Sequence, residues 1–173
     1  SRVLADHVAA HTRADRDKIH VIPNGLHAGW LATPRDYEAD QREIVVGWSG
    51  TASSARDFDL VAHALGRIVE YGDGEIKLQL VGLPPRHPSV ATLHRLIPRR
   101  LHDQVQSVEW VHHGSAYLSV VAGFDIQVAP YRPDPFVAAK FPTKAREAGM
   151  LGIPLVASDV LPYRRWAGHG RGV

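Results

Sequence analysis

From residue 43 onward the sequence alternates short apolar runs with amphipathic segments, and this alternation constrains the fold more than any other feature. The runs predict strands at residues 44–48, 76–81, 105–111, 124–129 and 154–157, and the intervening segments predict helices at 58–69, 89–96, 115–122 and 143–151. Near-continuous apolar strands separated by helices are typical of a parallel sheet that is buried on both faces. The sequence therefore predicts a Rossmann-like, doubly wound parallel α/β sheet.

The part of the chain before residue 43 lacks this alternation. It predicts a helix at residues 1–12, a short strand at 19–22 that ends in the turn Pro23-Asn24-Gly25, and a linker at 28–42. We therefore expect residues 1–18 to be a helix and linker at the end of a preceding domain. Residues 19–173 are expected to form the α/β domain, truncated at its C-terminus.

The composition excludes several classes of protein. With 45% hydrophobic and 22% charged residues, the 173-residue chain can bury one core and is not disordered. It contains no cysteine, which excludes disulfide scaffolds, thiolate zinc sites, iron-sulfur clusters and cysteine nucleophiles. The net charge is only +2 and the basic residues are scattered, so we expect no nucleic-acid partner.

The hydropathy pattern indicates where in the cell we expect the protein to be found. No run reaches the roughly 18 to 20 apolar residues that a membrane helix needs. Charged residues and histidines interrupt residues 1–14, where a signal peptide would be apolar. We therefore expect no transmembrane segment and a cytoplasmic location, with peripheral attachment of the intact protein to a membrane left open.

Two loops at predicted strand ends have the composition of phosphate sites, and ligands of open parallel sheets bind at the carboxyl ends of the strands. The first loop, Gly47-Trp48-Ser49-Gly50-Thr51, joins a strand to a helix, so the backbone N–H groups of Gly50 and Thr51 can approach an anion. It has neither the G-x-G-x-x-G spacing nor the GK[ST] of a P-loop, which argues against a nicotinamide or ATP site. An ordinary strand-to-helix turn is the alternative.

The second loop leads into the predicted helix 143–151, which Pro142 or Thr143 can begin. Lys140 precedes this helix and Lys144 lies in its first turns. A cation near a helix N-terminus is unfavourable by about 0.3 to 1 kcal/mol, so two lysines there favour an anion between them. Glu147 lies on the same face as Lys144 and can accept hydrogen bonds from ligand hydroxyls. A solvated helix end with a Lys-Glu pair is the alternative.

Metal and hydrolase sites are not supported by the remaining motifs. His7 and His11 have helical spacing but lack the glutamate of H-E-x-x-H, and no carboxylates accompany His112 and His113, so no metal site is expected. His112 can still line a ligand pocket at the end of its strand. Ser49 lacks the G-x-S-x-G elbow of a nucleophilic serine.

Three charged residues follow the first loop. Asp57 and Asp59 fall in the first turn of the predicted helix, where carboxylates complement the helix dipole, and we expect them to be structural. Arg56 is either a surface charge or reaches the same anion as Gly50 and Thr51.

Four short motifs stand in a fixed order along the chain. They are Ile22-Pro23-Asn24-Gly25, Gly47-Trp48-Ser49-Gly50-Thr51, Phe124-Asp125-Ile126 with Pro130, and Lys144-x-x-Glu147 followed by residues 152–158. In that order they resemble the I-P-N-G linker, the G-W-I-G-T/S loop, the F-D-I-x-V-x-P strand and the K-x-x-E-x-M-A-x-G-x-P-V-V-A-S segment of the retaining family-four, or group 1, GT-B glycosyltransferases. The resemblance covers about residues 19–173 and implies one half of a GT-B fold, the C-terminal nucleotide-sugar-binding domain.

The resemblance also implies roles for individual residues. Gly50, Thr51, Lys140 and Lys144 would face the diphosphate of a nucleotide diphosphate sugar, Glu147 would hold the ribose hydroxyls, and His112, in the loop after Trp110, would border the base. Lys144 and Glu147 are the expected catalytic residues. Ala139 stands eight residues before Glu147, at a position where family members often carry a glutamate that lies against the donor sugar. The resemblance therefore implies binding of the nucleotide more strongly than contact with the sugar.

The expected function is glycosyl transfer from a nucleotide diphosphate sugar to an unknown acceptor, by a hexosyltransferase-like and retaining enzyme. The donor is a substrate, and no cofactor is expected. The expected partners are this donor and the missing N-terminal GT-B domain, without which the fragment would be inactive. Two alternatives stay open: a GT-B nucleotide-sugar epimerase of the 2-epimerase type, and a non-catalytic module that binds a nucleotide or a protein.

Overall fold

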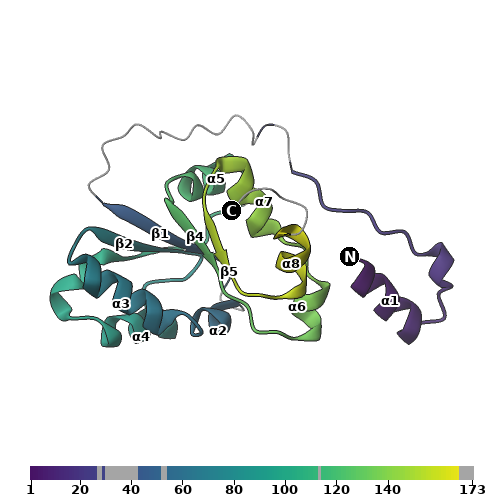
Figure 1. The fold of residues 1–173 in the computed structure, drawn as a ribbon, viewed down its shortest axis with the longest axis horizontal. Coiled ribbons are helices and arrows are strands. Elements are labelled where there is room, and N and C mark those ends of the chain that lie inside the picture. Colours follow the sequence, from purple (N-terminus) through teal and green to yellow (C-terminus); the bar gives the residue numbers. More distant parts are fainter. Residues whose placement is uncertain (27–28, 30–42, 52–53, 113, 168–173) are drawn as a thin grey trace.

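The computed structural model describes residues 1–26, 29, 43–51, 54–112 and 114–167. Within them lies a parallel five-stranded sheet with the order β3-β2-β1-β4-β5 (Figure 1). The strands are β1 (Ile44–Ser49), β2 (Ile76–Val81), β3 (Val105–Val108), β4 (Ile126–Ala129) and β5 (Leu155–Ala157). The predicted parallel α/β sheet is confirmed, although β3 ends earlier and β4 begins later than predicted.

Helices cover both faces of this sheet. One face carries α2 (Ala55–Phe58), α3 (Ala62–Gly72) and α4 (Pro88–Leu96), and the other carries α5 (Ser115–Ala122) and α7 (Thr143–Leu151) (Figure 1). Side chains alternate accordingly, because Val46 and Trp48 of β1 pack into the α2–α4 layer whereas Val45 packs into the α5–α7 layer. The apolar strands are thus explained by burial on both sides.

The predicted helix 58–69 is wrong as a single element, because the structure divides it into α2 and α3. Between them the chain tightens, with Leu60 N–H donating to the Asp57 carbonyl at 3.2 Å and Val61 N–H donating to the Phe58 carbonyl at 3.0 Å. These bonds span three residues instead of four, so the helix does not continue through them. Phe58 is still fully buried, whereas Ile68 is 40% exposed rather than part of the apolar face.

Two further elements differ from the sequence prediction. The predicted strand at 19–22 is wrong: residues 19–26 are irregular and Ile22 is 85% exposed, because an apolar run without a neighbouring strand has no ladder to join. Conversely, the Pro-rich loop contains a short helix, α6 (Pro135–Ala139), which begins with a hydrogen bond from Val137 N–H to the Asp134 carboxylate at 2.7 Å. The predicted linker lies almost wholly outside the described residues.

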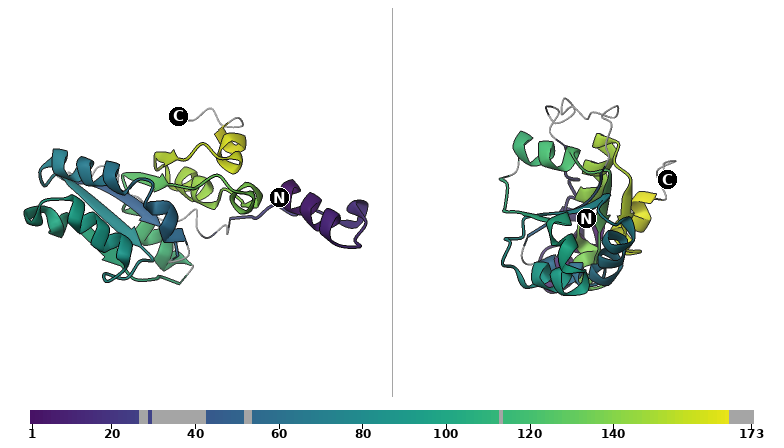
Figure 2. Two further views of the ribbon diagram at one scale, coloured as in Figure 1. Left: turned by 90° about the horizontal axis from the view of Figure 1, so that it is seen from below. Right: turned by 90° about the vertical axis from the view of Figure 1, so that its left-hand side faces the viewer.

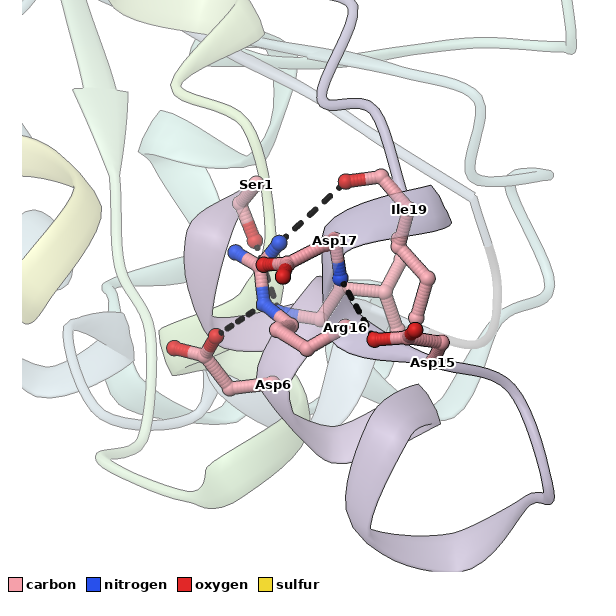
Figure 3. A network of polar contacts seen from close by, with 7 residues as sticks. Ser1, Asp6, Asp15, Arg16, Asp17 and Ile19 are labelled. Atoms are coloured by element: carbon pink, nitrogen blue, oxygen red, sulfur yellow. Dashed lines mark hydrogen bonds and ion pairs between the residues drawn. The ribbon is translucent and has the colours of Figure 1, made fainter.

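The N-terminal helix α1 (Arg2–His11) extends away from the sheet, beyond α6 (Figure 2). The Ser1 hydroxyl donates to the Ala139 carbonyl at 2.7 Å and connects the two helices. Arg16, at the start of a 3₁₀ turn (Arg16–Lys18), pairs with Asp6 at 2.7 Å and donates to the Ile19 carbonyl at 3.2 Å (Figure 3). The predicted origin of this segment in a preceding domain stays a prediction.

Gly47 is the point of closest approach between β1 and the α5–α7 layer. A Cβ atom at this position would stand 2.1 Å from the ring of Phe124, which is fully buried. The residue must therefore be glycine, and this requirement leaves room for an aromatic ring directly on the central strand.

We expect Gly47→Ala to lower the free energy of unfolding by about 1 to 3 kcal/mol, because the buried ring has no space to move. Gly149→Ala is the matched control: it lies in α7 with nothing within 4 Å of its added Cβ, and it should be neutral or stabilising. Urea denaturation followed by circular dichroism measures both. An unchanged midpoint for Gly47→Ala would contradict the described contact.

Candidate functional site

The order of the strands reverses between β1 and β4, so the loops that follow these two strands meet at the carboxyl edge of the sheet. After β1, Gly50 N–H donates to the Val81 carbonyl at 2.9 Å. A Cβ on Gly82, which has φ +91°, would stand 1.9 Å from the Gly50 carbonyl oxygen. Glycine at position 82 therefore allows the loops after β1 and β2 to touch.

The loop after β4 is tied to α2 across this edge. The Asp57 carboxylate accepts a hydrogen bond from Arg132 N–H at 3.3 Å and is only 5% exposed. The Asp59 carboxylate accepts from the Ser89 hydroxyl at 3.3 Å, which ties α2 to α4. Both aspartates make structural contacts between elements. Asp57 lies in the first turn of α2 as expected, whereas Asp59 is the C-cap of α2, so the expected effect on the helix dipole is wrong for Asp59.

A pocket of about 460 Å³ opens between α2, α6 and the loop after β1, and we call it the strand-end pocket. Its lining residues are Thr51, Ser54, Arg56, Asp57, Phe136, Val137 and Lys140. The Arg56 guanidinium also lies 3.6 Å from the Asp134 carboxylate. Arg56 is thus already paired and Asp57 adds a carboxylate to the lining, so an anion in this pocket would be met by Lys140 and the hydroxyl-bearing strand-to-helix loop.

The two lysines of the second loop converge on Tyr131, which follows β4. Lys144 Nζ donates to the Tyr131 hydroxyl at 3.0 Å, and Lys140 Nζ lies 4.9 Å from the centre of the Tyr131 ring. Lys140 Nζ also lies 4.8 Å from the centre of the Phe136 ring. Within the described ranges neither lysine forms an ion pair with a carboxylate. Their positive charges are therefore held by aromatic faces and a phenol rather than neutralised.

The lysines perturb Tyr131 in turn. Burial is the largest single influence and raises the pKa of Tyr131, but the charge and hydrogen bond of Lys144, the hydrogen bond with Tyr163 and the charge of Lys140 together hold that pKa below its ordinary value. Tyr163 stacks on Tyr131 with ring centres 5.5 Å apart, and its pKa is shifted in the opposite direction. Burial and the neighbouring Tyr131 raise the pKa of Tyr163.

Glu147, on α7, is 2% exposed and is one of the residues that line a second pocket of about 350 Å³, which we call the linker pocket. Its other lining residues are Asn24, Gly25, Leu26, Phe141, Thr143 and Arg146. The Tyr117 hydroxyl is 3.1 Å from Glu147 Oε2, and Arg146 donates to the Asn24 carbonyl, which fastens the irregular segment to α7. A buried carboxylate in a pocket can accept hydrogen bonds from ligand hydroxyls.

The residues predicted from the sequence fall into two groups. Thr51 and Lys140 line the strand-end pocket, whereas Glu147 lines the linker pocket. Gly50 is half-buried beside the Trp48 ring, and Lys144 lies on α7 between the two groups, one turn before Glu147. His112 is exposed on the loop after β3 and lines neither pocket, and His113 lies outside the described residues.

Sequence reasoning missed Tyr131 and Tyr117. Tyr131 stands alone after a strand and Tyr117 sits within an apolar helix, so neither belongs to a spacing pattern that signals a site. Among the described residues, no group of three or more metal-binding side chains gathers in one place. No helix in that part of the chain has the length and apolar character needed to cross a membrane.

Comparison with solved structures places the fold. The chain is similar to WaaG, a glycosyltransferase involved in lipopolysaccharide biosynthesis, with a TM-score of 0.69 and 15% identity over 95% of this chain and 44% of that one. It is also similar to a glycosyltransferase from Rickettsia africae, with a TM-score of 0.63 and 17% identity over 92% of this chain and 43% of that one. A third match is Anabaena Alr3699/HepE in complex with UDP and glucose, with a TM-score of 0.54 and 21% identity over 84% and 37% of the two chains.

The chain thus spans less than half the length of these structures, which share the GT-B architecture. The comparison with curated proteins finds no match. A family model described as "Glycosyl transferases group 1" matches residues 43–172, which comprise the whole sheet and the pocket-lining helices α2, α6 and α7. By this match over most of its length, the chain belongs to the group 1 glycosyltransferases.

Proposed function

We propose that this chain is the donor-binding half of a GT-B glycosyltransferase and binds a nucleotide diphosphate sugar at the carboxyl edge of its sheet. The observation that supports this most directly is the convergence of Lys140 and Lys144 on Tyr131 at the start of α7. Two cations that pair with no carboxylate among the described residues, beside a helix N-terminus that itself favours anions, form a strong site for a diphosphate.

In this proposal the diphosphate lies between Lys140, Lys144 and the loop of Gly50 and Thr51. The expected donation by the Gly50 N–H is not part of it, because that group already donates to the Val81 carbonyl. Thr51 and Lys140 line the strand-end pocket. Lys144 donates a hydrogen bond to the hydroxyl of Tyr131, and Lys140 lies over the ring of the same residue. Departure of the diphosphate develops negative charge on the leaving oxygen during glycosyl transfer. Preorganised positive groups at that oxygen are usually the largest catalytic contribution, which assigns Lys144 the main catalytic role.

We assign the nucleoside to the other part of the site. Glu147 accepts hydrogen bonds from the ribose hydroxyls, and the exposed loop that carries His112 borders the base. The buried Glu147 side chain is part of the lining of the linker pocket, which supports the first assignment. The position of His112 on the loop after β3, which leaves the same edge of the sheet, supports the second.

The complete reaction needs more than this chain. The similar structures are more than twice as long, so we propose that a second domain holds the acceptor and that this chain alone catalyses no transfer. Transfer with retention of configuration is part of the proposal. UDP is the first nucleotide to test, because the similar Anabaena protein was crystallised in complex with UDP and glucose.

The diphosphate assignment is tested with Lys144→Ala. Losing a hydrogen bond to a charged partner costs about 1.5 to 3 kcal/mol, so we expect affinity for the preferred nucleoside diphosphate to fall roughly 10- to 150-fold. Isothermal titration calorimetry with UDP, GDP and ADP measures the change. Lys77→Ala is the control, because Lys77 lies at the opposite end of β2, paired with Glu43. Equal affinities for Lys144→Ala and the unchanged chain would contradict the proposal.

The ribose assignment is tested with Glu147→Gln, which keeps the size of the side chain but removes its charge. We expect weaker binding of nucleoside diphosphates and unchanged binding of inorganic pyrophosphate, because only the former carries ribose hydroxyls. Glu70→Gln, on the exposed side of α3, serves as the control. The assignment is wrong if Glu147→Gln weakens both ligands to the same extent.

A further inference from the structure

A chain of buried polar side chains runs from the middle of the sheet to Glu147. Gln127 Nε2 on β4 lies 3.2 Å from Ser49 Oγ on β1, and Ser49 Oγ lies 3.0 Å from the Tyr117 hydroxyl on α5. The same hydroxyl lies 3.1 Å from Glu147 Oε2 on α7. The four residues are between 0% and 6% exposed, although they come from four different elements.

The protons along this chain can be counted. An ionised carboxylate only accepts and a phenol has a single proton, so Tyr117 donates to Glu147 and must accept from the Ser49 hydroxyl. Ser49 has then used its only proton and must accept from Gln127 Nε2, which only donates. All three hydrogen bonds therefore point toward Glu147.

Burying a polar side chain costs free energy unless it is hydrogen-bonded, so these three bonds restrict the positions of the four side chains. Within the described residues, Gln127 Oε1 is buried without a hydrogen-bond partner. Tyr117 is also held by apolar contacts, since its ring belongs to the core beneath α5 and α7 with Leu118 and Val121. Its hydroxyl consequently has a fixed position, and the carboxylate that accepts from it has one as well. Apolar packing alone would not require a hydroxyl here.

We propose that Tyr117 is a positioning residue for the ligand site: it holds the Glu147 carboxylate in place in the linker pocket, and Ser49 and Gln127 orient the Tyr117 hydroxyl for that purpose. The proposal rests on the proposed function for the claim that Glu147 meets the nucleoside. The placement of the carboxylate itself stands on the three hydrogen bonds.

The ionisation of Tyr117 agrees with this role. Burial raises the pKa of Tyr117, and the neighbouring negative charge of Glu147 raises it further. A raised pKa means that the phenol keeps its proton as the pH rises through the physiological range. Tyr117 therefore keeps the proton that it donates to Glu147 throughout that range.

The first experiment measures binding to Tyr117→Phe, which removes the hydroxyl and keeps the ring. We expect affinity for the preferred nucleoside diphosphate among UDP, GDP and ADP to fall roughly five- to tenfold, with inorganic pyrophosphate bound as tightly as before. Val121→Ala is the control for packing, because Val121 lies one turn further along α5 in the same core. It should lower thermal stability without changing the preference between the two ligands.

A double-mutant cycle separates positioning from a merely structural role. If Tyr117 acts through Glu147, then Tyr117→Phe should have no further effect on nucleotide affinity in the Glu147→Gln background. Additive losses would overturn the proposal. Unchanged affinity in Tyr117→Phe, while Glu147→Gln is impaired, would overturn it as well.

A crystal structure of Tyr117→Phe provides a test that needs no ligand. We expect the backbones of α5 and α7 to stay in place while the Glu147 carboxylate rotates away or occupies several rotamers. A carboxylate in its original rotamer would refute the positioning role. Ser49→Ala should show the same displacement in smaller measure, and it replaces Tyr117→Phe if the latter does not fold.

These results also separate the two proposals. If Glu147→Gln binds nucleoside diphosphates as the unchanged chain does, the ribose assignment fails, and the crystal structure alone then decides whether Tyr117 positions the carboxylate. If Glu147→Gln is impaired and Tyr117→Phe is not, the ribose assignment stands and the positioning role is wrong.

Discussion

The structure depends on a parallel sheet that is buried on both faces. Each strand must present apolar side chains to two helical layers. On the central strand β1, Val46 and Trp48 pack into one layer, while Gly47 has no side chain and leaves space for the ring of Phe124 in the other. Since all strands run in one direction, the loops at their carboxyl ends gather along one edge. The ligand site we propose is a consequence of that arrangement.

Burial on both faces also determines which polar side chains must form hydrogen bonds with one another. Gln127 and Ser49 lie on central strands and cannot reach water, so they pair with each other, and the pairing continues through Tyr117 to Glu147. At the carboxyl edge of the sheet the charged side chains are arranged differently. There Lys140 and Lys144 rest against Tyr131 without a carboxylate partner in the described part of the chain, which leaves their charge available to a ligand. One region thus combines a rigid acceptor with unneutralised cations.

Prediction from the sequence was accurate where local pattern and burial agree. The helices at 115–122 and 143–151 have the predicted bounds, because the Gly and Pro residues that flank them are local signals. The strand at 19–22 was wrong because an apolar run becomes a strand only when another strand is beside it. The division between α2 and α3 was missed because apolar spacing continues through a turn that only the backbone hydrogen bonds reveal.

The sequence by itself determined the fold class, the family motifs and the loops in which a ligand site could lie, since these follow from periodicity and from residues close together in the chain. Only the tertiary structure decided which side chains meet. Tyr131 joins Lys144 and Lys140, and Tyr117 joins Ser49 to Glu147 across 68 and 30 residues of sequence. Such contacts arise from the order of the strands and the packing of helices on them, and no local pattern in the sequence carries that information.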